Sequence, residues 1–184
     1  TDGLEEYDHY LDDVIRMVEH TRSAEVEALL SDLGEVLGAG GEVYNLLLDA
    51  DMTFPTVERP DGEAVEITQS NLTTLLKEPD REFRRTVHEE FYDELGTYRN
   101  TIGTTLSKAV KTHVKLADAR DYDTAREAAL DGPNVPTAVY DNLVDSVREN
   151  LDVLHRHAEL KREVLDVDEL RMWDLYMPMT ETES

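Results

Sequence analysis

The stretch Thr86–Glu94, TVHEEFYDE, places a His-Glu pair inside an apolar pattern of helical spacing. A zinc site of the H-E-x-x-H type needs two imidazoles four residues apart, so that both reach one metal ion while the glutamate activates a bound water. Four residues after His88 the chain has Tyr92, whose phenol does not complete such a site. The stretch therefore predicts no local metal centre.

The other histidines give weaker chemical signals. His155 and His157 stand two residues apart, and on a helix such positions point ~200° away from each other, so one ion cannot use both. His113 falls on the apolar stripe of a long helix, where a buried and satisfied histidine is the favoured interpretation and a cleft residue is the alternative. From the residues alone, we expect neither catalytic nor metal-binding residues in this chain.

The elements that must carry these residues are mostly helices. Apolar spacing predicts a helix over 4–20 and a second helix that starts after a Ser23 cap and stops at the glycines of 38–41. Residues 53–68 alternate around a Pro-Asp-Gly turn and predict one β-hairpin, which must lean on a neighbour because two isolated strands are marginal in water. A short helix is expected around 71–76.

Two long helices follow in the second half of the sequence. Pro79 and Asp80 open the first, which can run to about Ala119 with a bend at Gly96 or Gly103, and Pro136 opens the second, which runs to about Leu165. Between them a short helix should be capped by Asp123, and residues 170–179 should leave as an extended tail. The predicted fold is mainly α, a bundle of long antiparallel helices with one small hairpin. We divide it into 1–78 and 79–184 and treat both as one structural unit.

Charge is the most unusual feature of the composition. The 184 residues include 42 acidic and 18 basic side chains, for a net charge of -24. This balance excludes a nucleic-acid partner, since phosphate binding needs clusters of Lys and Arg. There is no cysteine, and we find no apolar run long enough to span a membrane, so we expect no membrane partner. The chain opens on Thr1 and ends in TETES, from which we expect a segment cut from a longer polypeptide.

The order of several segments resembles the N-terminal region of oligoendopeptidase F, in the thimet-oligopeptidase-like group of zinc peptidases. The most telling pieces are Pro79-Asp-Arg-Glu82 with Arg84, then Arg120 and Tyr122 before a short helix, and Asp174-Leu-Tyr-Met-Pro178. This resemblance implies a cytoplasmic peptidase of short peptides. Its zinc and H-E-x-x-H helix would belong to a C-terminal catalytic domain that this sequence does not contain, so the resemblance implies no cofactor in this chain.

That resemblance also implies a role for the chain. It would form one wall of the substrate channel and limit substrate size, with its own catalytic domain and oligopeptides as partners. His113, Arg120 and Tyr122 are the candidate channel-lining residues. Against this stand structural interpretations, in which Arg120 ties a helix end and Tyr122 packs before the cap of the next helix. A free-standing acidic interaction or scaffold domain without enzymatic role is the alternative function.

The first prediction concerns salt. A chain this acidic and poor in lysine is typical of halophilic proteins, because salt screens the self-repulsion of the charges. We expect the free energy of unfolding, measured by urea titration, to be higher in multimolar KCl than in low salt. An ordinary acidic protein is the alternative, and a stability that is flat or falls with KCl would establish it.

Overall fold

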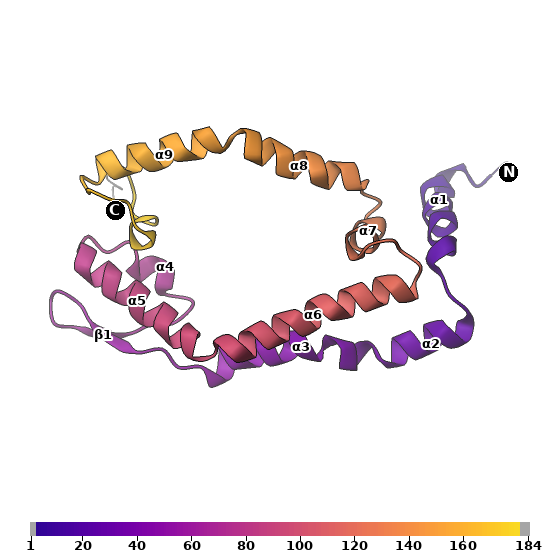
Figure 1. Ribbon diagram of the computed structural model, residues 1–184, viewed down its shortest axis with the longest axis horizontal. Helices are drawn as coiled ribbons and strands as arrows, with labels where there is room; N and C mark the ends of the chain where they lie inside the picture. Colours follow the sequence, from indigo (N-terminus) through magenta and orange to yellow (C-terminus); the bar gives the residue numbers. More distant parts are fainter. Residues whose placement is uncertain (1–2, 181–184) are drawn as a thin grey trace. The chain divides into compact units, whose positions relative to one another are not determined.

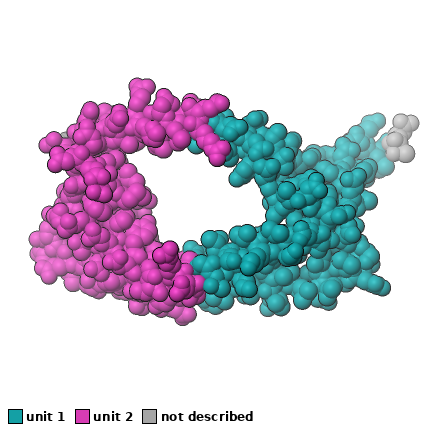
Figure 2. All heavy atoms as spheres, viewed as in Figure 1, with its two compact units in different colours: residues 1–46, 103–147 teal, residues 47–102, 148–184 magenta. Residues whose placement is uncertain are grey.

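The computed structural model describes residues 3–180, where helices and one two-stranded sheet confirm the mainly α fold (Figure 1). The chain forms two compact units (Figure 2): unit 1 is Thr1–Leu46 with Gly103–Val147, and unit 2 is Leu47–Ile102 with Arg148–Ser184. The division after residue 78 and the antiparallel packing of long helices stay predictions. The prediction of a longer polypeptide is based on the two ends of the sequence. Residues 1–2 and 181–184 of these ends lie outside the described residues.

Unit 1 begins with the two expected helices. The first forms as three consecutive pieces, with 3-10 turns at both ends: η1 (Glu5–Tyr7), α1 (Asp8–Met17) and η2 (Val18–His20). Helix α2 (Ala24–Asp32) then starts at the predicted cap, where the hydroxyl of Ser23 accepts a hydrogen bond of 3.4 Å from a first-turn amide. Such a cap satisfies one of the backbone donors that a helix start leaves unpaired.

The prediction that the glycines of 38–41 end a helix is wrong. Helix α3 (Gly34–Leu46) runs through them. Each helical glycine costs roughly 0.5–1 kcal/mol relative to alanine, so tertiary packing must hold this helix. Such packing is evident at Gly40, where an added Cβ would lie 3.4 Å from the carbonyl oxygen of Thr105 in α6 (Arg99–Ala119). The backbones of α3 and α6 therefore approach each other closely at this position.

Both long helical stretches are interrupted once. The break at Tyr98 lies two residues after Gly96, one of the two positions where a bend is predicted, whereas the continuous helix predicted through Asn150 is wrong. Tyr98 follows Gly96, which weakens a helix, and its amide bonds to the carbonyl of Leu95 in a tighter turn. The resulting pieces are α5 (Arg81–Thr97), α6, α8 (Thr137–Glu149) and α9 (Leu151–Val164). Among residues 3–180, no helix is both long and apolar enough to cross a membrane.

The short helix between them, α7 (Ala125–Asp131), is capped by Thr124 and not by Asp123 as predicted. The Thr124 hydroxyl accepts a hydrogen bond of 3.0 Å from the amide of Glu127. Asp123 lies one residue outside, and its own amide donates to the carboxylate of Glu127. Adjacent Asp and Thr are both good caps, and the sequence alone does not rank them by position.

The predicted hairpin is confirmed in unit 2. Strands β1 (Thr56–Glu58) and β2 (Ala64–Glu66) pair antiparallel with Val57 opposite Val65, and the turn contains Gly62 at φ +88. It leans on α5: Phe54 stacks on Phe91 with ring centroids 4.5 Å apart. Residues from η3 (Leu47–Asp51), the hairpin, α4 (Leu72–Leu75) and α5 form the core, namely Leu47, Met52, Phe54, Val57, Ile67, Leu75, Leu76, Phe83, Val87 and Phe91.

The predicted extended tail is wrong at its centre, where a 3-10 turn, η4 (Met172–Asp174), packs against α5. Asp174 is fully buried, and its carboxylate is paired with Arg81 at 2.8 Å and with Arg84 at 2.9 Å. Arg84, also buried, donates further to the backbone carbonyls of Glu78, Pro79 and Trp173. A buried carboxylate is tolerated only when its charge and lone pairs are matched in this way, so these contacts explain why the tail folds back.

The same contacts set the acidity of Asp174. Burial alone would raise the pKa of this carboxyl, but hydrogen bonds from Arg81, from the amide of Arg171 and from Arg84 outweigh it and lower the pKa below its usual value. A carboxyl with a depressed folded pKa stabilises the fold above its unfolded pKa of about 3.9. This stabilisation is lost as the pH falls through the folded pKa.

We predict that Asp174→Asn lowers the free energy of unfolding by about 3 kcal/mol at neutral pH, because it leaves the buried Arg84 charge without a counter-ion. Below about pH 4 the free energy of unfolding of the variant should also fall less steeply than that of the unmodified chain. Urea titration at several pH values measures both effects. Asp93→Asn, at an exposed position of α5, is the control and should change stability by less than about 0.5 kcal/mol. Equal stability of the two variants would contradict the prediction.

Candidate functional site

The end of α6, the loop after it and α7 surround a pocket of about 300 Å³ within unit 1. All three sequence-predicted residues, His113, Arg120 and Tyr122, line it. The rest of the lining is mostly alanine and other small or apolar residues, with the carboxylate of Asp131 at one side. The structure thus brings the three candidates together, while their role in a substrate channel stays a prediction.

His113 lies on α6 with an exposed side chain, so the favoured interpretation of a buried core histidine is wrong. Among residues 3–180 its ring has no hydrogen-bond or ion-pair partner. The apolar stripe misled the prediction because its neighbours Leu106 and Val110 are themselves exposed, at 64% and 53%. An imidazole in this state can donate to or accept from a ligand.

Arg120 ties the end of α6 to its neighbours in unit 1. Its guanidinium bonds to the carboxylate of Glu27 in α2 at 2.9 Å, and its carbonyl accepts a 3.0 Å hydrogen bond from Nδ1 of His20. Hydrogen bonds lower the pKa of Glu27: the bond from the backbone amide of Arg22 has the largest effect, and the bond from Arg120 adds to it. Burial acts in the opposite direction. One nitrogen of Arg120 therefore has a structural partner, and a guanidinium has five N–H donors in all.

Tyr122 is the centre of a second set of contacts in unit 1. Its hydroxyl donates to Asp131 at 2.7 Å, and its ring stacks on that of His20 with centroids 3.5 Å apart. Asp131 is also paired with Arg16 of α1. Burial, with a further effect from the hydrogen bond to Asp131, raises the pKa of Tyr122 to about 12. At neutral pH the phenol is therefore a donor and not a nucleophile or base.

A second pocket of about 460 Å³ lies beside the first and shares His113, Leu116 and Arg120 with it. Its other lining comes from α2, α3 and α6, chiefly leucine, glycine and alanine, and contains no acidic residue. Sequence reasoning missed this pocket, as it missed the partners Glu27, His20 and Asp131. Arg16 and Asp131 are 115 positions apart, and no spacing rule connects such residues.

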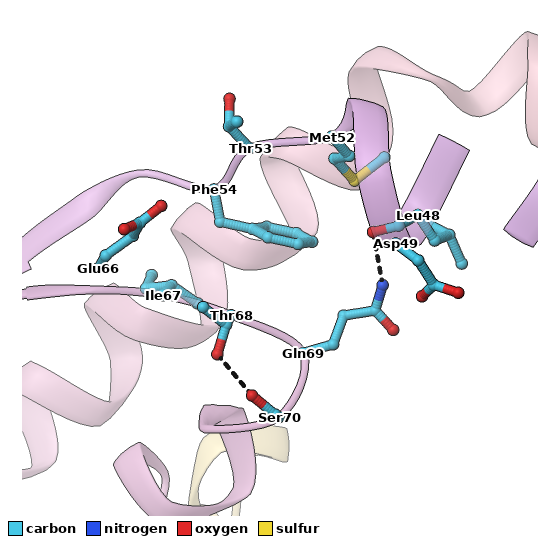
Figure 3. A pocket seen from close by; sticks show the side chains of 10 residues that line it. All are labelled: Leu48, Asp49, Met52, Thr53, Phe54, Glu66, Ile67, Thr68, Gln69 and Ser70. Carbon is cyan, nitrogen blue, oxygen red and sulfur yellow. Dashed lines mark hydrogen bonds between the residues drawn. The ribbon is translucent and has the colours of Figure 1, made fainter. Parts of the chain in front are cut away.

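Unit 2 has a pocket of about 300 Å³ between the end of η3 and the segment after β2 (Figure 3). The side-chain amide of Gln69 donates to the carbonyl of Leu48 at 3.1 Å, and the hydroxyls of Thr68 and Ser70 are hydrogen-bonded at 3.0 Å. Figure 3 draws both bonds as dashed lines. The side chains of Gln69, Thr68 and Ser70 are thus bonded within the chain. None of the sequence-predicted site residues lies here.

His88 is half-buried and packs its ring against Tyr92 and Trp173, with burial lowering its pKa. His155 and His157 are exposed on α9. Within residues 3–180 no group of three or more His, Asp or Glu side chains could hold a metal ion. His88 therefore has a packing role.

Comparison with known proteins gives the class to which this chain belongs. Residues 74–184, more than half of the chain, match the model of peptidase family M3, so the chain belongs to this family. Residues 1–54 match the model described as Oligopeptidase F, which confirms the resemblance found in the sequence.

Individual relatives agree with this assignment. The chain is 38% identical to Oligopeptidase PepF of Bacillus subtilis over 176 residues, which cover 96% of the chain and 26% of that protein. It is 34% identical to Group B oligopeptidase PepB of Streptococcus agalactiae, covering 97% of the chain and 30% of that protein. The crystal structure of oligoendopeptidase-F from Enterococcus faecium superposes with a TM-score of 0.91 at 39% identity, over 96% of this chain and 34% of that one. The chain therefore spans about a quarter to a third of these relatives.

We predict that Tyr122→Phe lowers the free energy of unfolding by about 1 kcal/mol at pH 8, through loss of the hydrogen bond to Asp131. Because the folded pKa of Tyr122 lies above the unfolded value of about 10, its stabilisation is present below pH 10 and lost as the pH rises toward 12. The variant should therefore show a shallower alkaline decline in urea titrations than the unmodified chain. Tyr10→Phe, at an exposed position of α1, should keep the original decline; identical behaviour of both variants would refute the assignment.

Proposed function

We propose that this chain supplies a non-catalytic wall of the peptide channel in a zinc oligopeptidase of family M3, and that the wall limits the size of the peptides that enter. The pocket lined by His113, Arg120 and Tyr122 carries the proposal. It joins an apolar surface to hydrogen-bond donors, and a peptide offers apolar side chains and carbonyl acceptors. The exposed imidazole of His113 is the donor most available to a substrate.

The relatives support this proposal through their names, Oligopeptidase PepF and Group B oligopeptidase PepB. Each of these proteins is far longer than the segment that the chain matches, so most of their residues have no counterpart here. The proposed peptidase activity would rest on residues outside this sequence. Membership in a peptidase family does not favour the alternative of a free-standing scaffold domain.

Zinc does not fit the side chains that the structure describes. A catalytic zinc needs three protein ligands and an open position, and residues 3–180 contain no cluster that could provide them. We therefore derive no catalytic step from this chain. Its side chains would bind and orient peptides and exclude those that are too large.

The wall can be tested in the full-length native protein with His113→Ala. We expect kcat/KM for peptides long enough to reach the wall to change about fivefold, the equivalent of one hydrogen bond, with little change for the shortest peptides. Lys111→Ala, on a different side of α6 and outside both pockets, is the matched control. Unchanged kcat/KM at every peptide length would remove the proposed role. The 184-residue chain alone, supplied with zinc and a quenched peptide, should cleave nothing, and cleavage would also overturn it.

A further inference from the structure

We infer that the larger pocket of unit 1 binds the carboxyl-terminal residue of a peptide, with its apolar side chain inside and its α-carboxylate at His113 and Arg120. This inference rests on the proposed function and adds the part of the peptide that is recognised. We call the site the α3–α6 pocket; Leu30, Leu37, Gly38, Gly41 and Leu116 line its apolar part.

The size and lining of the α3–α6 pocket fit one large apolar side chain. Its volume of about 460 Å³ lies within the range of roughly 300–1,000 Å³ that is usual for small-ligand sites. Leu30, Leu37 and Leu116 are only half-buried, so each keeps apolar surface that a ligand could cover. Covering such surface is favourable by about 25 cal/mol per Å² before the costs of binding are subtracted.

The glycines of α3 keep this pocket open. At Gly34, Gly38 and Gly41 an added Cβ would meet no atom within 4 Å, whereas at Gly40 it would approach the backbone of α6. Of these four glycines, only Gly40 packs against another helix of the chain. At the other three positions the helix lacks a side chain although there is space for one, and that space belongs to the pocket.

Charge identifies the polar end of the ligand. The chain has 42 acidic residues among 184, yet none lines the α3–α6 pocket, where the ionisable groups are His113 and Arg120. Nη2 of Arg120 donates to the carboxylate of Glu27, which lies outside the lining, so one nitrogen of this guanidinium already binds a carboxylate. In a chain of net charge -24, a carboxylate ligand needs hydrogen-bond donors, and at this pocket these are the remaining N–H groups of Arg120 and the imidazole of His113. A peptide carboxyl terminus joins such an anion directly to an apolar side chain.

The experiment uses the full-length native protein and a short peptide that ends in the photoreactive residue p-benzoylphenylalanine, with a free carboxylate. After irradiation, mass spectrometry locates the labelled residues. We expect label on residues 30–41 and 109–116, displaced by a peptide ending in phenylalanine. The amide form of that competitor should displace it at least tenfold less well, because a charge-assisted hydrogen bond is lost, an estimate of about 1.4 kcal/mol.

Substitutions that place a leucine side chain in the pocket can be compared with the same substitution outside it. Gly38→Leu and Gly41→Leu place a side chain in open space and should reduce labelling of the α3–α6 pocket about tenfold. Gly103→Leu makes the same change in α6, also in open space but outside the pocket, and should leave labelling unchanged. Circular dichroism should show equal helix content in all three, since leucine favours helix over glycine.

The outcomes separate this inference from the proposed function. Label at the pocket that the acid displaces and the two leucine variants suppress supports the inference. Label elsewhere within residues 1–184, or equal displacement by the acid and the amide peptide, overturns the inference of binding at the α3–α6 pocket. The proposed channel wall is not affected by that outcome. Label only outside residues 1–184 overturns both. A pocket inaccessible to every peptide because another part of the protein covers it also overturns the inference.

Discussion

The buried carboxylate of Asp174 is the interaction on which unit 2 depends. It compensates two arginines of α5, one of them buried, and it holds the η4 turn against the helix that also supports the hairpin and the apolar core. A buried ionic cluster is not the most stabilising choice for a core, but its geometry tolerates few alternatives. Its hydrogen bonds to Arg81 and Arg84 join the η4 turn directly to α5.

In unit 1 the elements are also connected by hydrogen bonds and ion pairs, but the side chains that make them are partly exposed. Arg16, Asp131 and Tyr122 connect α1, α7 and the loop before α7, while Arg120 and Glu27 connect α6 to α2. Its apolar residues are mostly exposed or half-buried. Hydrogen bonds and ion pairs therefore contribute more to holding its helices together than they do in unit 2. Arg120 and Tyr122, which line its pockets, belong to these networks and are held next to open apolar surface, whereas His113 has no partner among residues 3–180.

Local sequence signals determined much of the fold. The Ser23 cap, the Asp80 cap and the Pro-Asp-Gly hairpin turn were all readable, because each acts over a few residues. The glycines of α3 misled the prediction, since their cost in a helix is local while the close approach to Thr105 is not. The resemblance selected the segments around Arg81 and Asp174 without showing that they bind each other across 93 positions. His113, Arg120 and Tyr122 were found as a group because they lie close in sequence; their partners were not.

The separation of Arg81 and Asp174 also bears on how the chain is made. Ribosomes add roughly 5–20 residues per second, so Arg84 and the rest of α5 emerge some 5–20 s before their counter-ion does. During that interval the nascent polypeptide has two arginines without the carboxylate that later pairs with both, and the apolar side of α5 lacks its final cover. Helix α5 therefore reaches its final surroundings only after residues 172–174 have been made.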